Sequence, residues 1–306
     1  HLYHGEILKN IMLETIFSII FSGLFFGSLY ALLAVGLSLL YGVSKTINLA
    51  HGDFMMIGAY ITYALYVFVK IDPVLSLLIV SGILSPISIV LYHKCGFSKI
   101  LLSSIPASVK ESSTLLASFG LSIILSNFIA LIFTPNYQTY AYSTPTIVIP
   151  IIETKLIFTR ILMMLISFFI IVMLWIVAKT TWLGLEMRCV LDDPIAAQLM
   201  GIDLNKIYLI VYVIGITTAG LAGSLFSMSY YINPYMGVEY TMAAFVAIIL
   251  GGIGSIRGSL VGGLIIGLVE STLIYFTAPL LRIAVIYLIL LITLWIKPTG
   301  IFRGGI

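Results

Sequence analysis

Long apolar segments separated by short polar stretches run through almost the whole chain. Most approach or exceed the roughly 20 residues that an α-helix needs to cross a bilayer, and they are continuous rather than alternating, which excludes a transmembrane β-barrel. The pattern predicts an all-α polytopic membrane protein with eight to ten membrane helices, in a single transmembrane domain over residues 1–306. Nine ranges stand out: 15–43, 54–69, 73–93, 113–134, 157–178, 206–231, 241–256, 258–277 and 279–297.

The composition supports this prediction. Hydrophobic residues make up 61% of the chain and charged residues 9%, with a mean hydropathy of +1.18. Soluble domains typically carry about 25% charged residues, so a water-soluble globule is excluded. The formal net charge of +3 is too small and too scattered to indicate a nucleic-acid partner. Cys95 and Cys189 fall in loops that we expect in the reducing cytoplasm, so no disulfide is expected.

The basic residues predict how the chain is oriented in the membrane. Two loops, 94–110 and 179–206, are separated by two predicted helices and therefore lie on the same side. They carry Lys94, Lys99, Lys110, Lys179, Arg188 and Lys206. By the positive-inside rule this side is cytoplasmic, which places the large loop 135–156 outside a prokaryotic plasma (inner) membrane.

A glycine-rich run, Gly251-Gly252-Ile253-Gly254-Ser255-Ile256-Arg257-Gly258, interrupts the hydrophobic sequence after residue 250. The region could form one very long helix or two short ones. Two helices place Arg257 and Lys297 on the cytoplasmic side, so we predict two. The first would be about 24 Å long at 1.5 Å per residue, shorter than the membrane core. A tilted, broken or re-entrant element is therefore expected, with its non-helical backbone shielded by protein or water.

The cytoplasmic loop 179–206 contains a short helix with its own capping residues. Asp193 can cap the first turn, Pro194 suits the first helical position and Gly201 suits the left-handed position beyond the end. Ile195 and Leu199, four residues apart, form an apolar face of this helix, and Met200 lies beside them. The segment is either a connecting helix on its own protein or in the lipid interface, or a plug for a soluble partner.

A polar cluster interrupts the hydrophobic run between residues 44 and 54, at or just inside the membrane boundary. Its side chains include Asn48, His51 and Asp53, and Asp53 could cap the helix that follows. One interpretation is a buried polar turn bonded to backbone, and the other is a hinge or gate lining a pathway. His51 and Asp53 are too few for a metal site, so no metal is expected.

Intramembrane charge is scarce elsewhere, with Glu270 alone in the segment 258–277. An ion-coupled carrier would need acidic side chains within its membrane helices to bind or relay ions. An enzyme would need a nucleophile with its base or a metal cluster. The glycine-rich run lacks the Gly-Lys-Ser/Thr ending of a nucleotide-binding loop, so any ATP would be bound by another chain. Gly263 and Gly267 form a Gly-x-x-x-Gly pair, which indicates close helix packing.

The short helix also carries Ala196 and Ala197 with Gly201 four residues later. This spacing resembles the Glu-Ala-Ala-x-x-x-Gly coupling loop of ATP-binding-cassette importer permeases, with Ile195 in place of the Glu. From about Gly23 to Gly304 the chain resembles the permeases of high-affinity, binding-protein-dependent branched-chain amino acid importers. The segments that carry the resemblance are 27–32, 47–54, 196–202, 219–223, 244–255 and 297–300.

The resemblance implies a membrane-spanning permease subunit and not an enzyme, translocating branched-chain amino acids by alternating access. It implies a second identical or homologous permease, two cytoplasmic subunits that hold ATP and Mg²⁺, and an extracytoplasmic solute-binding protein. No cofactor would be bound by this chain itself. Alternatives are the same architecture importing urea, short amides or another small polar solute, or an ATP-independent channel or carrier.

Two groups of residues become candidates on this basis. ATPase coupling is assigned to the short helix: Asp193, Ile195, Ala196, Ala197, Leu199, Met200 and Gly201. The translocation pathway or gate is assigned to the polar and glycine positions near or within the membrane: Asn48, His51, Asp53, Gly251, Gly252, Gly254 and Glu270.

Overall fold

The computed structural model describes residues 2–103, 105–142, 146–149, 154–276, 281–297 and 299–302. Over these ranges the chain is almost entirely helical. The elements are α1 (Leu2–Ser44), α2 (His51–Ala64), the π-helical turn η1 (Leu65–Val69), α3 (Pro73–Lys94), α4 (Phe97–Leu102), α5 (Ala107–Phe133), β1 (Thr146–Ile149), β2 (Thr154–Ile157), α6 (Phe158–Thr180), α7 (Trp182–Asp192), α8 (Pro194–Leu199), α9 (Leu204–Ser227), α10 (Met236–Gly251), α11 (Ile256–Phe276) and α12 (Leu281–Ile296).

The prediction of an all-α polytopic membrane protein is confirmed. Seven helices within the described ranges are at least 18 residues long and apolar enough to cross a membrane. Two shorter apolar helices cover residues 236–251 and 284–296. In chain order these nine helices correspond to the nine predicted ranges, although α5 begins six residues earlier than the hydrophobic pattern indicates.

Three regions that the hydrophobic pattern leaves as loops contain regular structure. The helix α4 lies in the loop 94–110, and α7 lies in the loop 179–206 beside the predicted short helix. Of the loop 135–156, the structure describes 135–142, 146–149 and 154–156. The strands β1 and β2 pair there as an antiparallel hairpin. Each of these elements is too short to produce a membrane-length hydrophobic segment, so the pattern does not reveal it.

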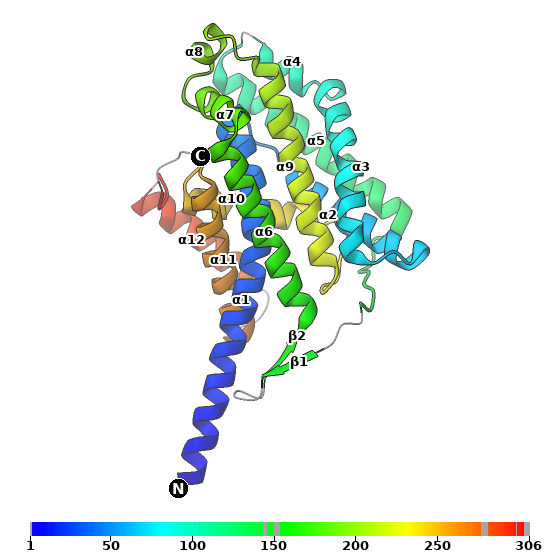
Figure 1. Ribbon diagram of the computed structural model, residues 1–306, viewed down its shortest axis with the longest axis vertical. Coiled ribbons are helices and arrows are strands. Elements are labelled where there is room, and N and C mark those ends of the chain that lie inside the picture. Colours follow the sequence, from blue (N-terminus) through cyan, green and yellow to red (C-terminus); the bar gives the residue numbers. More distant parts are fainter. Residues whose placement is uncertain are drawn as a thin grey trace.

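Most of the long helices run roughly along one axis and give the molecule two distinct ends (Figure 1). The helices α4, α7 and α8 lie together at one end, which agrees with the prediction that the loops 94–110 and 179–206 share one side of the membrane. The hairpin β1–β2 lies toward the opposite end, as does the start of α1. We call these the inner end and the outer end, following the orientation that the basic residues predict.

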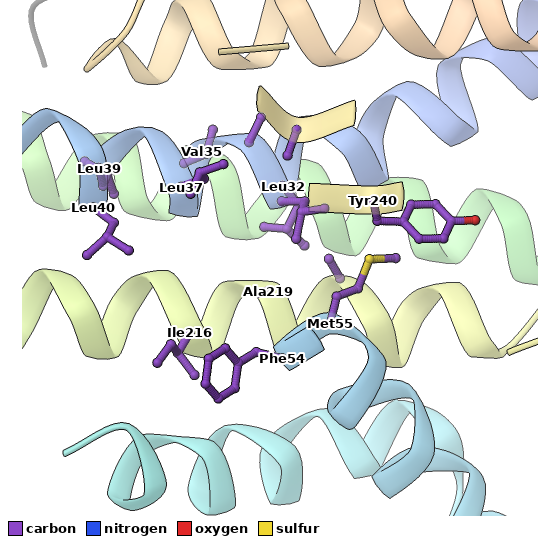
Figure 2. Close-up of a cluster of buried hydrophobic side chains, with 14 of the residues drawn as sticks. Leu32, Val35, Leu37, Leu39, Leu40, Phe54, Met55, Ile216, Ala219 and Tyr240 are labelled. Carbon is purple, nitrogen blue, oxygen red and sulfur yellow. The ribbon is translucent and has the colours of Figure 1, made fainter. Parts of the chain in front are cut away.

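The second half of α1 forms the centre of the bundle. It packs against α11, α9, α10 and α6, and side chains such as Leu32 are completely buried. Figure 2 shows the cluster that it forms with Phe54 of α2, Ile216 of α9 and Tyr240 of α10. A helix that is apolar on all sides can be surrounded by lipid or by other helices, and this part of α1 is enclosed by other helices.

Glycine positions allow α1 and α11 to approach closely. A Cβ atom placed on Gly267 would collide with the backbone of Gly27, and one on Gly263 would collide with Ala31. Small residues permit such backbone contact between membrane helices. The interpretation of Gly263 and Gly267 as a packing pair is therefore confirmed.

The glycine-rich run breaks the chain into two helices, as predicted. The helix α10 ends at Gly251, and Gly252 and Gly254 adopt φ angles of +110° and +82° before α11 begins at Ile256. Residues that carry a side chain rarely adopt these φ angles, whereas glycine adopts them without strain. With 16 residues, α10 is about 24 Å long, shorter than a bilayer core of about 30 Å.

Candidate coupling site and translocation pathway

The short helix α8 has the caps that its sequence predicts. The Asp193 side chain is the N-cap, and its Oδ1 atom accepts hydrogen bonds from the amides of Ile195 (2.9 Å) and Ala196 (3.1 Å). Pro194 occupies the first helical position, and Gly201 has a φ of +89° just beyond the C-terminus. These local interactions fix a helix of only six residues, a length at which an isolated helix would be marginal.

The apolar face of α8 points away from the rest of the chain. Ala197 is buried against the protein with 3% of its surface exposed, whereas Ile195, Leu199 and Met200 are 73%, 83% and 84% exposed. At 100° per residue, positions 195 and 199 lie on the side of the helix opposite Ala197. The described residues therefore do not cover this face, which argues against a helix that rests on its own protein.

A groove of about 610 Å³ adjoins α8 at the inner end. Its lining residues come from α7, α8 and the turn that follows: Trp182, Leu185, Glu186, Cys189, Asp192, Asp193, Ala196, Ala197, Met200, Gly201 and Ile202. The lining is mostly apolar and includes the carboxylates of Glu186, Asp192 and Asp193. Cys189 is a free thiol in this groove, and Cys95 is likewise free and exposed.

The helix α7 forms one wall of this groove and was not predicted as a separate element. Thr181 caps it, accepting a hydrogen bond from the amide of Gly184 at 3.2 Å. Met187 and Val190 are buried three residues apart on the face that packs against the bundle. The threonine cap and this helical spacing are visible in the sequence, but α7 has only 11 residues, too few for the hydrophobic pattern of a membrane helix to reveal it.

The polar cluster between α1 and α2 is buried inside the bundle. Asn48, His51 and Asp53 are all less than 4% exposed. The Nε2 atom of His51 lies 3.1 Å from the carbonyl oxygen of Leu33, and the Oδ1 atom of Asn48 accepts a hydrogen bond from the amide of Ala50 at 3.1 Å. These bonds to backbone match the interpretation of the segment as a buried polar turn.

The prediction that Asp53 caps α2 is wrong. The N-cap of α2 is Ala50, which provides no side-chain hydrogen bond, and Asp53 lies inside the first turn. The amide of Gly52 is instead satisfied by the Thr241 hydroxyl of α10, at 2.7 Å. Ser118 of α5 plays a similar part by accepting a hydrogen bond from the amide of Leu49 at 3.0 Å. Hydroxyl groups from two other helices thus support the start of α2.

Three atoms of this cluster are buried and have no hydrogen-bond partner among the described residues: Asn48 Nδ2, His51 Nδ1 and Asp53 Oδ2. Burying a polar group without a partner is costly, and such groups inside a membrane are commonly part of a functional path. The assignment of this cluster to a gate remains a prediction that the unpartnered atoms favour.

The other predicted pathway residues lie in different places. Gly251, Gly252 and Gly254 belong to the break between α10 and α11, where the amide of Gly254 donates to the Ser38 hydroxyl at 3.1 Å. The amide of Phe302 donates to the carbonyl of Gly251 at 2.9 Å, so the C-terminal segment shields this backbone.

Glu270 lies apart from this break. It is fully buried on α11, about 21 Å farther along the helix axis than Ile256. Its carboxylate lies near the hydroxyl of Tyr30 on α1. The structure therefore does not bring the seven pathway candidates together in a single site, and the assignment of Glu270 to the pathway remains a prediction.

The outer end contains a set of tyrosines that hold the loop after α5 in place. The Tyr66 hydroxyl donates to the carbonyl of Ala141 at 3.0 Å, and the Tyr142 hydroxyl donates to Asp72 Oδ2 at 3.1 Å. Burial, followed by the nearby Asp72 carboxylate, raises the pKa of Tyr142 above its usual value, so the phenol keeps the proton that it donates. Polar, tyrosine-rich loops therefore form a defined outer surface.

Comparison with known proteins agrees with this architecture. The sequence profile described as "Branched-chain amino acid transport system / permease component" matches residues 19–294. The chain belongs to this permease family. The match covers every predicted membrane segment in whole or in large part, and the permease is a multi-pass protein of the inner membrane.

Individual relatives extend over nearly the whole permease. The high-affinity branched-chain amino acid transport system permease protein LivH of Salmonella typhimurium is 31% identical over 294 residues, which is 92% of this chain and 93% of the relative. LivH of Escherichia coli (strain K12) is 28% identical, and the permease protein BraD of Pseudomonas aeruginosa is 29% identical, with the same coverage. No solved structure matches the permease.

Proposed function

We propose that this permease is the membrane-spanning subunit of an ATP-driven importer of branched-chain amino acids. An extracytoplasmic binding protein delivers the substrate, two cytoplasmic subunits hydrolyse ATP with Mg²⁺, and a second, identical or homologous permease completes the pathway. The names of the full-length relatives support the substrate class. The observation that carries the link to ATP is the exposed apolar face of α8.

This face is suited to insertion into a groove on another protein. Ile195 and Leu199 project from a capped helix at the end of the molecule that carries the two basic loops. Apolar side chains presented at helical spacing are a recurring way for a short helix to dock into a partner. Because α7 holds α8 against the bundle through buried residues, motion of a docked partner would reach the membrane helices directly.

The mechanism that follows is alternating access. Closure of the two ATPase subunits on ATP moves α8, and the membrane helices around the pathway change between inward-open and outward-open arrangements. The polar cluster at Asn48, His51 and Asp53 acts as a gate in this scheme. The permease need not bind the substrate tightly, because the binding protein captures it first.

The test is to replace Leu199 with Asp in the purified complex and to measure ATP hydrolysis and leucine uptake in liposomes. Placing a charge in an apolar dock should separate hydrolysis from uptake or release the ATPase subunits, without lowering the thermal stability of the membrane part. Val109→Asp is a matched control, because Val109 is also apolar and exposed, and it lies in the other basic loop, in the first turn of α5. Normal assembly and coupled uptake in Leu199→Asp would contradict docking through α8.

The same liposomes distinguish the alternatives for substrate and energy source. Uptake of urea or acetamide in preference to leucine would assign the same architecture to a small polar solute. Solute entry by the permease alone, without ATPase subunits, would identify a channel or carrier.

A further inference from the structure

A cavity with a mostly apolar lining opens near the outer end between α1, α11 and the start of α6. Its volume is about 320 Å³, at the lower end of the range of about 300–1,000 Å³ typical of small-molecule sites. We call it the outer pocket. Its described lining residues are Ser18, Ile19, Ser22, Phe26, Arg160, Tyr230, Ser271, Ile274 and Tyr275.

The outer pocket contains one cationic side chain among these residues, that of Arg160. The guanidinium carbon of Arg160 lies 5.7 Å from the ring centroid of Phe25 and 5.5 Å from that of Tyr230. These two rings are themselves stacked, with 5.8 Å between their centroids. Cation–π contacts of this kind orient a guanidinium without using its N–H donors.

The Nε donor of Arg160 is therefore available to a ligand. Its Nε atom is buried and has no hydrogen-bond partner among the described residues. A guanidinium presents its N–H groups as a planar fork that matches a carboxylate, and such charge-assisted pairs are among the strongest hydrogen bonds in proteins. A buried donor in a cavity, held by aromatic rings, is the arrangement expected for an anion-binding position.

The remaining walls divide into a polar and an apolar part. Ser18 and Ser22 of α1 bring hydroxyl oxygens to the pocket, and such oxygens can accept hydrogen bonds from an ammonium group. Ile19, Phe26 and Ile274 present carbon surface. The walls from α1 and α11 are fixed to each other, since the Ser271 hydroxyl donates to the carbonyl of Ile19 at 2.8 Å.

We propose that the outer pocket binds the amino acid as it enters the membrane, with the Arg160 guanidinium on the substrate carboxylate and the apolar wall against the aliphatic side chain. This inference rests on the proposed function, because it assigns a place on this chain to the proposed substrate. A site of this composition prefers a zwitterion with a hydrophobic side chain, and urea and acetamide lack both the carboxylate and the side chain.

The test measures occupancy directly rather than transport. A Tyr275→Cys variant, at an exposed lining residue with no assigned contact to the substrate, is made in a Cys95→Ser, Cys189→Ser background, assembled with its partner subunits in nanodiscs and labelled with a small maleimide in the presence of leucine. Leucine should slow the labelling of the cysteine at position 275, and leucinamide, which lacks the carboxylate, should not. A cysteine in place of Ser112, which lies at the opposite end of the molecule on α5, should be labelled at the same rate in all conditions.

Adding Arg160→Gln should raise the leucine concentration for half-protection by about tenfold to a hundredfold, and Arg160→Lys should have a smaller effect. Protection that is equal for leucine and leucinamide, or absent for both, would overturn the proposal even if the Arg160 variants fail to fold. ATP-driven leucine uptake by the same cysteine variant separates the two hypotheses. Uptake without protection rejects the outer pocket and keeps the importer, whereas loss of uptake with intact leucine-specific protection counts against the importer alone.

Discussion

The cap of α8 provides the sharpest test of how this short helix keeps its shape. Replacing Asp193 with Ala removes the Oδ1 atom that accepts the amides of Ile195 and Ala196. Loss of an N-cap costs about 1 kcal/mol, within a range of about 0.5–2 kcal/mol. For a helix of six residues, about 1 kcal/mol is a large share of the local stability. It corresponds to about a fivefold increase in the population of molecules in which α8 is unfolded.

Hydrogen exchange measured by mass spectrometry on the complex in nanodiscs reports this population. The amides of Ala197 and Met200, which donate to Asp193 and Ala196 carbonyls within α8, should exchange about fivefold faster in Asp193→Ala. Asp193→Asn is the matched variant, because asparagine caps as well as aspartate while removing the charge. The amides of α8 in Asp193→Asn should exchange almost as slowly as those in the unmodified protein.

The number of leucine molecules transported per ATP should follow the same order, lowest in Asp193→Ala, since a partly open α8 transmits motion less well. Equal exchange rates in the alanine and unmodified proteins would refute the argument that the cap stabilises α8. Faster exchange with unchanged coupling would instead show that α8 needs no preformed shape.

Two further predictions concern the membrane helices. Gly267→Leu should lower the thermal unfolding temperature of the complex, because the added side chain meets the backbone of Gly27 and overpacking costs about 1–3 kcal/mol or more. Gly82→Leu on α3, where an added Cβ meets nothing within 4 Å, should leave the unfolding temperature nearly unchanged, and equal losses in both would contradict the packing argument. A cysteine in place of Asn48 should be labelled at different rates in the ATP-bound and nucleotide-free states, and constant protection in both would favour a purely structural polar turn.

Local chemistry explains why the sequence predicts α8 so well. Asp193, Pro194 and Gly201 each act within a few residues of their own position, and the structure confirms the cap and the left-handed end that they predict. The break at Gly252 and Gly254 is equally local, because it depends on backbone angles that other residues avoid. The fold class, the nine apolar helices and the shared side of the two basic loops follow from hydrophobicity and charge in the same way.

The polar cluster shows why contacts inside the bundle could not be predicted with the same success. Asp53 was expected to cap α2 because it lies near the start of the helix, but the amide of Gly52 bonds to Thr241, 189 residues away. The outer pocket likewise depends on Arg160 meeting the rings of Phe25 and Tyr230 from two other parts of the chain. No spacing in the sequence connects these positions.

Residues that act through neighbours in the chain can thus be assigned from sequence, whereas residues that act through neighbours in space need the packed helices. This difference bears on Glu270, which the sequence presents as an isolated intramembrane charge and the structure places beside Tyr30 in a fully buried setting on the outer half of α11. A scarcity of charge made Glu270 conspicuous in the sequence, but its surroundings decide its role. From its position on α11 the Glu270 carboxylate reaches Tyr30 of α1, so it is placed to join these two helices, whose glycines pack backbone to backbone.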